Sequence, residues 1–223
     1  MKIEKLNVGP LGACCYIVIN EDTKQAIIID PGGSHQDIID LIEKNGLAPR
    51  LIINTHGHGD HMGANKEVKE TFPEIKIAIH KDDVECLTQP KKNLSFLGGF
   101  LLKSPPADIV LKEGDKVGID GIELEVIHTP GHTPGGICLL GRSSSDSGSG
   151  SGSGSGKKPD VLFSGDTLFQ GGIGRTDFPG GDHAALIRSI QDKLLVLDGD
   201  TAVYPGHGDT TTIEEEKENN PFV

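Results

Sequence analysis

The sequence predicts an α/β fold of four layers, in which two β-sheets pack face to face and helices cover their outer faces. Three observations lead to this prediction. Short apolar, β-branched runs recur along both halves of the chain, stretches with helical periodicity follow them in each half, and Gly- and Pro-rich turns separate them. Because the order of elements is similar in the two halves, we expect both to pack into one domain spanning residues 1–223.

The first half begins with three apolar runs separated by Gly-Pro and a polar turn, which predicts an antiparallel meander. The segment Asp30-Pro31-Gly32-Gly33 ends the meander, and Ser34 is expected to cap a helix that ends at Gly46. The strands expected in this half are Ile3–Val8, Cys14–Ile19, Ala26–Ile29, Arg50–Ile53 and Ile75–Ile79, and its second helix is Met62–Thr71.

The second half repeats the pattern after Asp108. The strands expected in the second half are Val117–Ile119, Ile122–Ile127, Gly136–Leu140, Val161–Phe163 and Thr201–Tyr204, and its helices are Asp182–Leu195 and one opened by a capping box of Thr212 and Glu215.

Two segments depart from the pattern. Residues 89–107 are irregular and form a candidate flap or substrate wall. Residues 143–156 are almost wholly Ser and Gly, which predicts a flexible insertion of natural or engineered origin.

Composition narrows the classes of function. A formal net charge of -12 argues against a nucleic-acid backbone as the main partner, because phosphate contacts need clustered Lys and Arg. No apolar run approaches the roughly 20 residues of a membrane helix. The first residues lack the apolar stretch of a signal peptide, so a cytoplasmic protein is expected.

The stretch from Asn54 to His61 carries the strongest chemical signal. His56 and His58 are two residues apart, so extended backbone points both rings the same way, whereas Asp60 and His61 follow where the chain turns into a helix and can face a second point. Gly57 and Gly59 are expected to permit unusual backbone angles and close approach. The spacing suits two adjacent cations, and mixed imidazole and carboxylate ligands favour zinc, iron or manganese over calcium or magnesium.

Three further candidate ligands stand in Gly- or Pro-rich turns at strand ends, as a preorganised site requires. His132 lies in Pro130-Gly131-His132, Asp166 in Gly165-Asp166-Thr167 and His207 in Gly206-His207-Gly208. With the first loop they supply five imidazoles and two carboxylates. The remaining histidines, His35, His80, His128 and His183, are assigned no metal role.

This ordered set, a THxHxDH motif, a lone His, an Asp in a Gly-Asp-Thr turn and a terminal His, resembles the metallo-β-lactamase superfamily over essentially the whole chain. The resemblance implies a four-layer αββα sandwich with two mixed sheets. It also implies that His56, His58 and His132 bind one metal, that Asp60, His61 and His207 bind a second, and that Asp166 bridges both.

The segments 164–169, 172–178 and 204–208 are similar to those of short bacterial hydroxyacylglutathione hydrolases, the glyoxalase II-like group. This resemblance implies hydrolysis of S-lactoylglutathione or a related S-acylglutathione by a hydroxide that bridges two divalent metal ions, with zinc the first choice. Asp60 and Asp166 would be the catalytic carboxylates beside that metal-bound hydroxide, and Arg175 would contact the glutathione moiety. A thiolate leaves without a general acid, since a thiol has a pKa of about 8.5.

The chain departs from glyoxalase II in two ways. It stops at Val223 without the C-terminal helical region that helps to hold glutathione, and Asp177 stands where that enzyme has a tyrosine. An equally good interpretation of Arg175 is that it forms an ion pair with Asp177 or Asp182 and does not bind substrate. Three alternative functions remain open: a persulfide dioxygenase with a single non-haem iron, which shares a segment like Gly174–Phe178; a β-lactam hydrolase, disfavoured without an export signal; and a non-catalytic binding protein on the same fold.

Overall fold

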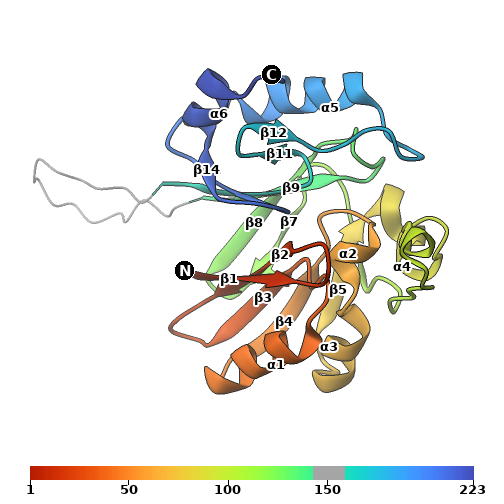
Figure 1. Cartoon of the computed structure of the whole chain (residues 1–223). Coiled ribbons are helices and arrows are strands. Elements are labelled where there is room, and N and C mark those ends of the chain that lie inside the picture. Colours follow the sequence, from red (N-terminus) through yellow and green to blue (C-terminus); the bar gives the residue numbers. More distant parts are fainter. Residues whose placement is uncertain (143–158) are drawn as a thin grey trace, which may run out of the picture.

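Two β-sheets stack face to face in the computed structural model, which describes residues 1–142 and 159–223 (Figure 1). Helices α1 (His35–Lys44) and α3 (Asn65–Thr71) cover the outer face of one sheet, and α5 (His183–Ser189) and α6 (Ile213–Asn219) cover the other. The four-layer α/β prediction is therefore confirmed. The predicted Ser/Gly insertion at 143–156 lies outside the described residues.

The first sheet has the strand order β1-β2-β3-β4-β5-β6. Strands β1 to β3 are antiparallel, which confirms the predicted meander, and β3 to β6 are parallel. The strands are β1 (Lys2–Val8), β2 (Ala13–Ile19), β3 (Gln25–Ile29), β4 (Ala48–Ile53), β5 (Lys76–His80) and β6 (Ile109–Leu111). Strand β6 was not predicted, because three residues are too few to show a period.

The second sheet has the order β14-β13-β10-β9-β8-β7 and is also mixed, since β10 pairs with β13 in parallel and its other pairs are antiparallel. Its strands are β7 (Lys116–Ile119), β8 (Ile122–His128), β9 (Ile137–Gly141), β10 (Val161–Gly165), β13 (Ala202–Pro205) and β14 (Thr211–Thr212). A two-stranded ribbon that was not predicted, β11 (Leu168–Phe169) and β12 (Gly172–Ile173), follows β10.

Alternation along β2 shows how the layers are held together. Cys15 and Ile17 face the core beneath α1 and α3, whereas Tyr16 and Val18 face the core between the two sheets. The ring of Tyr16 lies 5.4 Å from that of Phe163 on β10, centroid to centroid. Because strands buried on both faces read as continuous apolar runs, the Ala13–Ile19 sequence lacks a polar alternate.

Two helix predictions need correction. Ser34 occupies the N-cap position of α1, as predicted, but its side chain does not cap the helix. Its backbone is left-handed, with φ 47°, and its hydroxyl accepts a hydrogen bond from the backbone N–H of Gly9 at 3.3 Å. The expected helix Met62–Thr71 is two helices, α2 (Gly59–Met62) and α3. The chain breaks between them where the N–H of Ala64 donates to the carbonyl of Pro31 at 2.8 Å, which ties the histidine-rich loop to the turn after β3.

The C-terminal helices start as predicted. The Asp182 carboxylate accepts a hydrogen bond from the N–H of Ala185 at 2.9 Å, and α5 continues into a π-helical turn over Ile190–Leu194. The Thr212 hydroxyl accepts from the N–H of Glu215 at 3.2 Å, which is one arm of the capping box. Within the described residues, no helix has the length and apolar character needed to span a bilayer.

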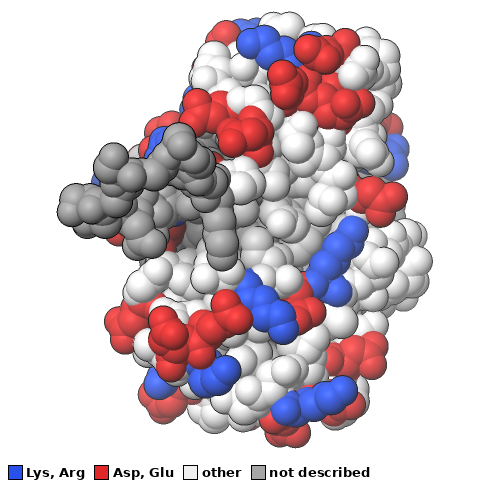
Figure 2. Space-filling model, turned by 90° about the vertical axis from the view of Figure 1, so that its left-hand side faces the viewer, with Lys and Arg blue, Asp and Glu red and all other residues white. Residues whose placement is uncertain are grey.

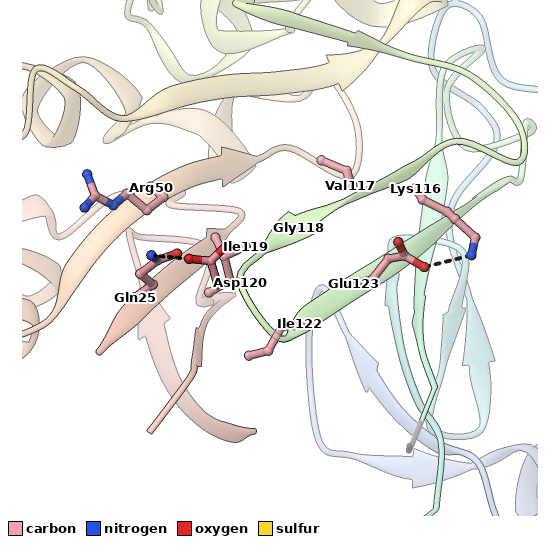
Figure 3. A pocket seen from close by; sticks show the side chains of 9 residues that line it. All are labelled: Gln25, Arg50, Lys116, Val117, Gly118, Ile119, Asp120, Ile122 and Glu123. Carbon is pink, nitrogen blue, oxygen red and sulfur yellow. Dashed lines mark hydrogen bonds and ion pairs between the residues drawn. The ribbon is translucent and has the colours of Figure 1, made fainter. Parts of the chain in front are cut away.

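Charge is dispersed over the face of the molecule drawn in Figure 2. On the face in Figure 2, basic side chains lie among more abundant acidic ones and do not gather into one stripe. A depression of about 410 Å³ lies between the β7–β8 hairpin and the starts of β3 and β4 (Figure 3). Four of its polar side chains are paired with one another, Gln25 with Asp120 at 3.0 Å and Lys116 with Glu123 at 2.8 Å.

Candidate metal centre

The loop after β4 carries the three histidines of the first motif, all of them buried. His56 and His58 lie in the loop itself, and His61 lies in the short helix α2. Gly57 and Gly59 both have negative φ, so the expected unusual backbone angles are absent. Both glycines are closely packed, but against residues that are not candidate ligands. A Cβ on Gly57 would lie 2.4 Å from the Cβ of Cys86, and one on Gly59 would lie 3.3 Å from the Cβ of Ser95.

His56, His58 and His132, which we call the histidine trio, meet although 74 residues separate the last two. Each residue can offer one ring nitrogen within 4.8 Å of the others. Nδ1 of His58 lies 2.9 Å from Nε2 of His132. The rings stand nearly perpendicular to one another, with centroids 4.6 to 4.8 Å apart. This arrangement points three nitrogen atoms at one small volume.

Asp60, His61 and His207, which we call the mixed trio, meet beside it with ligand atoms within the same 4.8 Å. Nε2 of His61 lies 3.2 Å from Nε2 of His207, and Oδ2 of Asp60 lies 3.4 Å from that same nitrogen of His207. The family resemblance implied both trios, and the structure brings their members together.

Asp166 stands between the two trios. Its Oδ1 lies 3.4 Å from Nε2 of His61, and its Oδ2 lies 3.5 Å from Nε2 of His132. One carboxylate therefore faces both groups. Gly206 packs directly on it: a Cβ at that position would lie 2.2 Å from Oδ1 of Asp166. Only a glycine fits there without displacing the carboxylate.

The donor set fits two divalent cations. Of the three buried side-chain atoms in the described residues that lack a hydrogen-bond partner, two are here: Nε2 of His56 and Oδ1 of Asp166. Nδ1 of His132 donates to the carbonyl of Arg175 at 2.7 Å, so its Nε2 carries the lone pair that faces the trio. Unpartnered buried acceptors are rare, and a cation satisfies them.

Electrostatics support this fit. Burial, with the neighbouring His132, lowers the pKa of His58 to about 3, and burial with His61 lowers that of His56 well below its usual value. Both rings are thus neutral, the form that binds metal. Burial opposes a charge on His61, but the charges of Asp166 and Asp30 outweigh it and raise the pKa of His61 to about 10. A divalent cation would neutralise the same excess of negative charge.

Asp30 was not predicted as a site residue, but it supports the mixed trio. It follows β3, is buried and has a left-handed φ of 52°. Its carboxylate accepts hydrogen bonds from the N–H and hydroxyl of Thr55 at 2.7 and 2.6 Å and contacts Nδ1 of His61 at 3.0 Å. By holding Nδ1, Asp30 fixes the ring of His61 so that Nε2 faces the other members of the mixed trio. The only sequence signal was the turn at Asp30-Pro31-Gly32-Gly33.

Arg175 lies at the edge of the site, with its side chain 55% exposed. It forms a two-pronged ion pair with Asp177, both bonds at 2.8 Å, and its guanidinium lies 3.8 Å from the ring centroid of Phe178. The Phe178 ring in turn lies 6.1 Å from that of His58. Of the two carboxylates considered as partners, Asp177 is therefore the one that pairs with Arg175. The guanidinium lies beside the metal centre, over Phe178.

The other histidines lie elsewhere. His80 and His128 stack in parallel, with centroids 4.0 Å apart at 18°, and Asp82 is close enough to join them. His128 uses Nε2 to donate to the carbonyl of Pro134 at 2.9 Å. Parallel rings direct their lone pairs side by side, not at a common point, so this cluster is a poor ligand set. His35 and His183 begin helices at the surface.

Comparison with known proteins agrees with this geometry. The family model of the metallo-beta-lactamase superfamily matches residues 8–145 and 144–207. The chain belongs to the metallo-beta-lactamase superfamily.

Within the superfamily, hydroxyacylglutathione hydrolase GloC of Haemophilus influenzae is 39% identical over 228 residues, covering 100% of this chain and 98% of GloC. The crystal structure of the B3 metallo-beta-lactamase BLEG-1 superposes with a TM-score of 0.87 at 37% identity and covers 99% of each chain. A structure of TTHA1623 in a di-iron-bound form superposes with a TM-score of 0.78 at 32% identity, over 99% of this chain and 100% of that one.

Proposed function

We propose that this superfamily member is a dinuclear metal hydrolase that cleaves the thioester of S-acylglutathiones such as S-lactoylglutathione. The observation that carries the proposal is the position of Asp166, whose two oxygens face two separate trios of ligand atoms. The end-to-end similarity to GloC supports the substrate class, and the di-iron form of TTHA1623 supports two metal ions. We propose zinc as the first choice, and the same donors also accept iron or manganese.

The histidine trio, the mixed trio and the bridging Asp166 would hold the two cations. When bound, such cations polarise a carbonyl oxygen and lower the pKa of water towards neutrality. Asp166 would keep the two positions at a set separation. Asp60 is more exposed than Asp166, 23% against 11% of its side chain, so it is placed to accept a hydrogen bond from an incoming water.

Two features of the chain suit a thioester. The pKa of Asp60 lies well below its usual value. Burial alone would raise it, but the hydrogen bond with His207 and the charge of His61 outweigh burial. Asp60 therefore accepts hydrogen bonds and does not serve as a general acid. A thiolate needs none, because a thiol has a pKa of only about 8.5. We propose that Arg175, held over Phe178, contacts an anionic part of the substrate.

An activity panel tests the substrate proposal. Protein loaded with two equivalents of zinc should hydrolyse S-lactoylglutathione and related S-acylglutathiones. Two further assays separate the alternatives: a chromogenic β-lactam, included because of the likeness to BLEG-1, and oxygen uptake with glutathione persulfide on iron-loaded protein. Inactivity towards thioesters combined with turnover of either other substrate would refute the proposed function.

The change Asp166→Ala tests the ligand assignment. Without the bridging carboxylate, bound metal should fall below two equivalents, and kcat/KM should fall by at least about 100-fold. Asp192→Ala, which removes an exposed carboxylate from the π-helical turn, is the control and should change neither. Elemental analysis and the thioester assay give the two readouts. A fully metallated and active Asp166→Ala variant would show that the ligand assignment is wrong.

A further inference from the structure

A second buried carboxylate, Asp83, lies behind the histidine trio. It ends the turn of 3₁₀-helix η1 (Lys81–Asp83), which leads from β5 into α4 (Val84–Thr88), and it is 1% exposed. It belongs to none of the motifs that supply candidate ligands. Its carboxylate nevertheless makes three hydrogen bonds, each 2.8 Å long, to residues of the loops that carry those ligands.

The three donors come from the two loops that carry the histidine trio. Oδ2 of Asp83 accepts from the N–H of Gly57, which lies between His56 and His58, and from the hydroxyl of Thr133, which follows His132. Oδ1 accepts from the N–H of Gly135 in the same turn as Thr133. The single carboxylate thus joins two segments that are more than 70 residues apart.

Packing shows that both loops are shaped around this side chain. A Cβ on Gly135 would lie 2.6 Å from Cγ of Asp83, and a Cβ on Gly57 would lie 3.3 Å from Cβ of Asp83. Contacts under about 3.0 Å require something to move, so a side chain at Gly135 would displace the carboxylate. The loops approach Asp83 as closely as their backbones allow.

Burying this carboxylate carries an energetic cost. The three groups that bond to it, two backbone N–H groups and one hydroxyl, are all neutral, and burial outweighs these hydrogen bonds, so the pKa of Asp83 is raised. A neutral side chain could fill the same space without that cost. The negative charge lies close to His132, where it favours a cation held by the histidine trio.

The two buried carboxylates reach the trios differently. Asp30 contacts Nδ1 of His61 in the mixed trio, and it also reaches the histidine trio through the hydroxyl of Thr55, which lies 3.2 Å from Nδ1 of His56. Asp83 bonds to Gly57, Thr133 and Gly135 and contacts no member of the mixed trio. Loss of Asp83 should consequently affect the metal position of the histidine trio more than the other.

We propose that Asp83 is a positioning residue that sets the spacing of His56, His58 and His132 through their loops and thereby tunes the affinity of one of the two metal positions. This inference rests on the ligand assignment in the proposed function. In Asp83→Asn an amide NH₂ replaces one acceptor and faces a backbone N–H. Loss of a residue behind metal ligands typically weakens metal binding by about 10- to 100-fold.

Zinc titration against a chromophoric chelator tests the inference in two backgrounds, each keeping one trio. In His207→Ala, which keeps the histidine trio, Asp83→Asn should raise the zinc dissociation constant about 10- to 100-fold. In His132→Ala, which keeps the mixed trio, it should change that constant less than about threefold. Equal effects in both backgrounds, or none in either, would overturn the inference and leave the proposed function standing.

Glu216→Gln is the matched control for lost stability. Glu216 is also 1% exposed and accepts three hydrogen bonds, from the N–H of Gly171, the hydroxyl of Thr211 and the amide of Asn220, at 2.7 to 2.9 Å. It should lower the melting temperature without changing either zinc constant. A zinc constant weakened as much by Glu216→Gln as by Asp83→Asn would reduce the effect to general destabilisation and overturn the inference.

Thr133→Val supplies a milder variant should Asp83→Asn fail to fold. It removes one of the three donors, so it should weaken zinc binding in the His207→Ala background alone, by a smaller factor, and Thr133→Ser should restore it. An unchanged zinc dissociation constant in Thr133→Val would overturn the positioning role proposed for Asp83. Wild-type protein that binds fewer than two equivalents of zinc would instead overturn the ligand assignment itself.

Discussion

Gly206→Ala isolates the contribution of a single methyl group to the metal centre. Gly206 lies among the described residues with negative φ, so alanine is compatible with its backbone, and the effect is purely steric. The new Cβ would lie 2.2 Å from Oδ1 of Asp166 and 2.8 Å from Cε1 of His61. To restore an ordinary contact of 3.4 Å, the carboxylate oxygen must retreat by about 1.2 Å.

A displacement of about 1 Å in a catalytic group costs about 100-fold in rate, and overpacking of this kind costs about 1–3 kcal/mol of stability. The assay compares kcat/KM for the thioester, bound zinc and the melting temperature. Gly172→Ala is the control, because its Cβ would meet its nearest neighbour, the Cβ of Phe169, at an ordinary 3.8 Å. Wild-type activity in Gly206→Ala would refute the view that Asp166 must keep this position.

Two further predictions concern stability. Tyr16→Phe removes the buried hydroxyl that donates to the carbonyl of Pro205 at 2.6 Å, so urea unfolding should show a loss of about 1–3 kcal/mol, whereas Tyr204→Phe should show little change. Burial and the stacked ring of His128 lower the pKa of His80 from 6.5 to about 4, so the unfolded chain takes up this proton first. The free energy of unfolding should therefore fall as the pH drops from about 6.5 to 4, and His80→Gln should flatten that fall; parallel curves would disprove the assignment.

Strands and metal-binding motifs were the features most accessible to sequence reasoning. Long β-branched runs such as β2 and β4 carry their own period, and a histidine-rich loop is recognisable wherever it stands. The short elements β6, β11 and β12 escaped, because two or three residues form a strand only when a neighbouring strand is already in place. The break between α2 and α3 escaped for a similar reason, since the carbonyl of Pro31 that ends the first turn comes from a distant segment.

The candidate site divides in the same way. The seven proposed ligands are polar residues in Gly- or Pro-rich turns, so their types and spacing were visible. Asp30 and Asp83 were not, because a carboxylate that accepts hydrogen bonds from loops 25 to 52 residues away has no local signature. Ser34 shows the converse error: a residue type suited to capping was assigned a cap, but its hydroxyl bonds to Gly9.

By itself the sequence determined which atoms were available to bind metal and which runs would form strands, because both depend on residue type and short-range spacing. Only the tertiary structure decided that His132 lies against His58, that Asp166 faces both trios, and that Arg175 is held by Asp177. Those relations depend on how two sheets stack, and stacking is settled by the packing of side chains far apart along the chain.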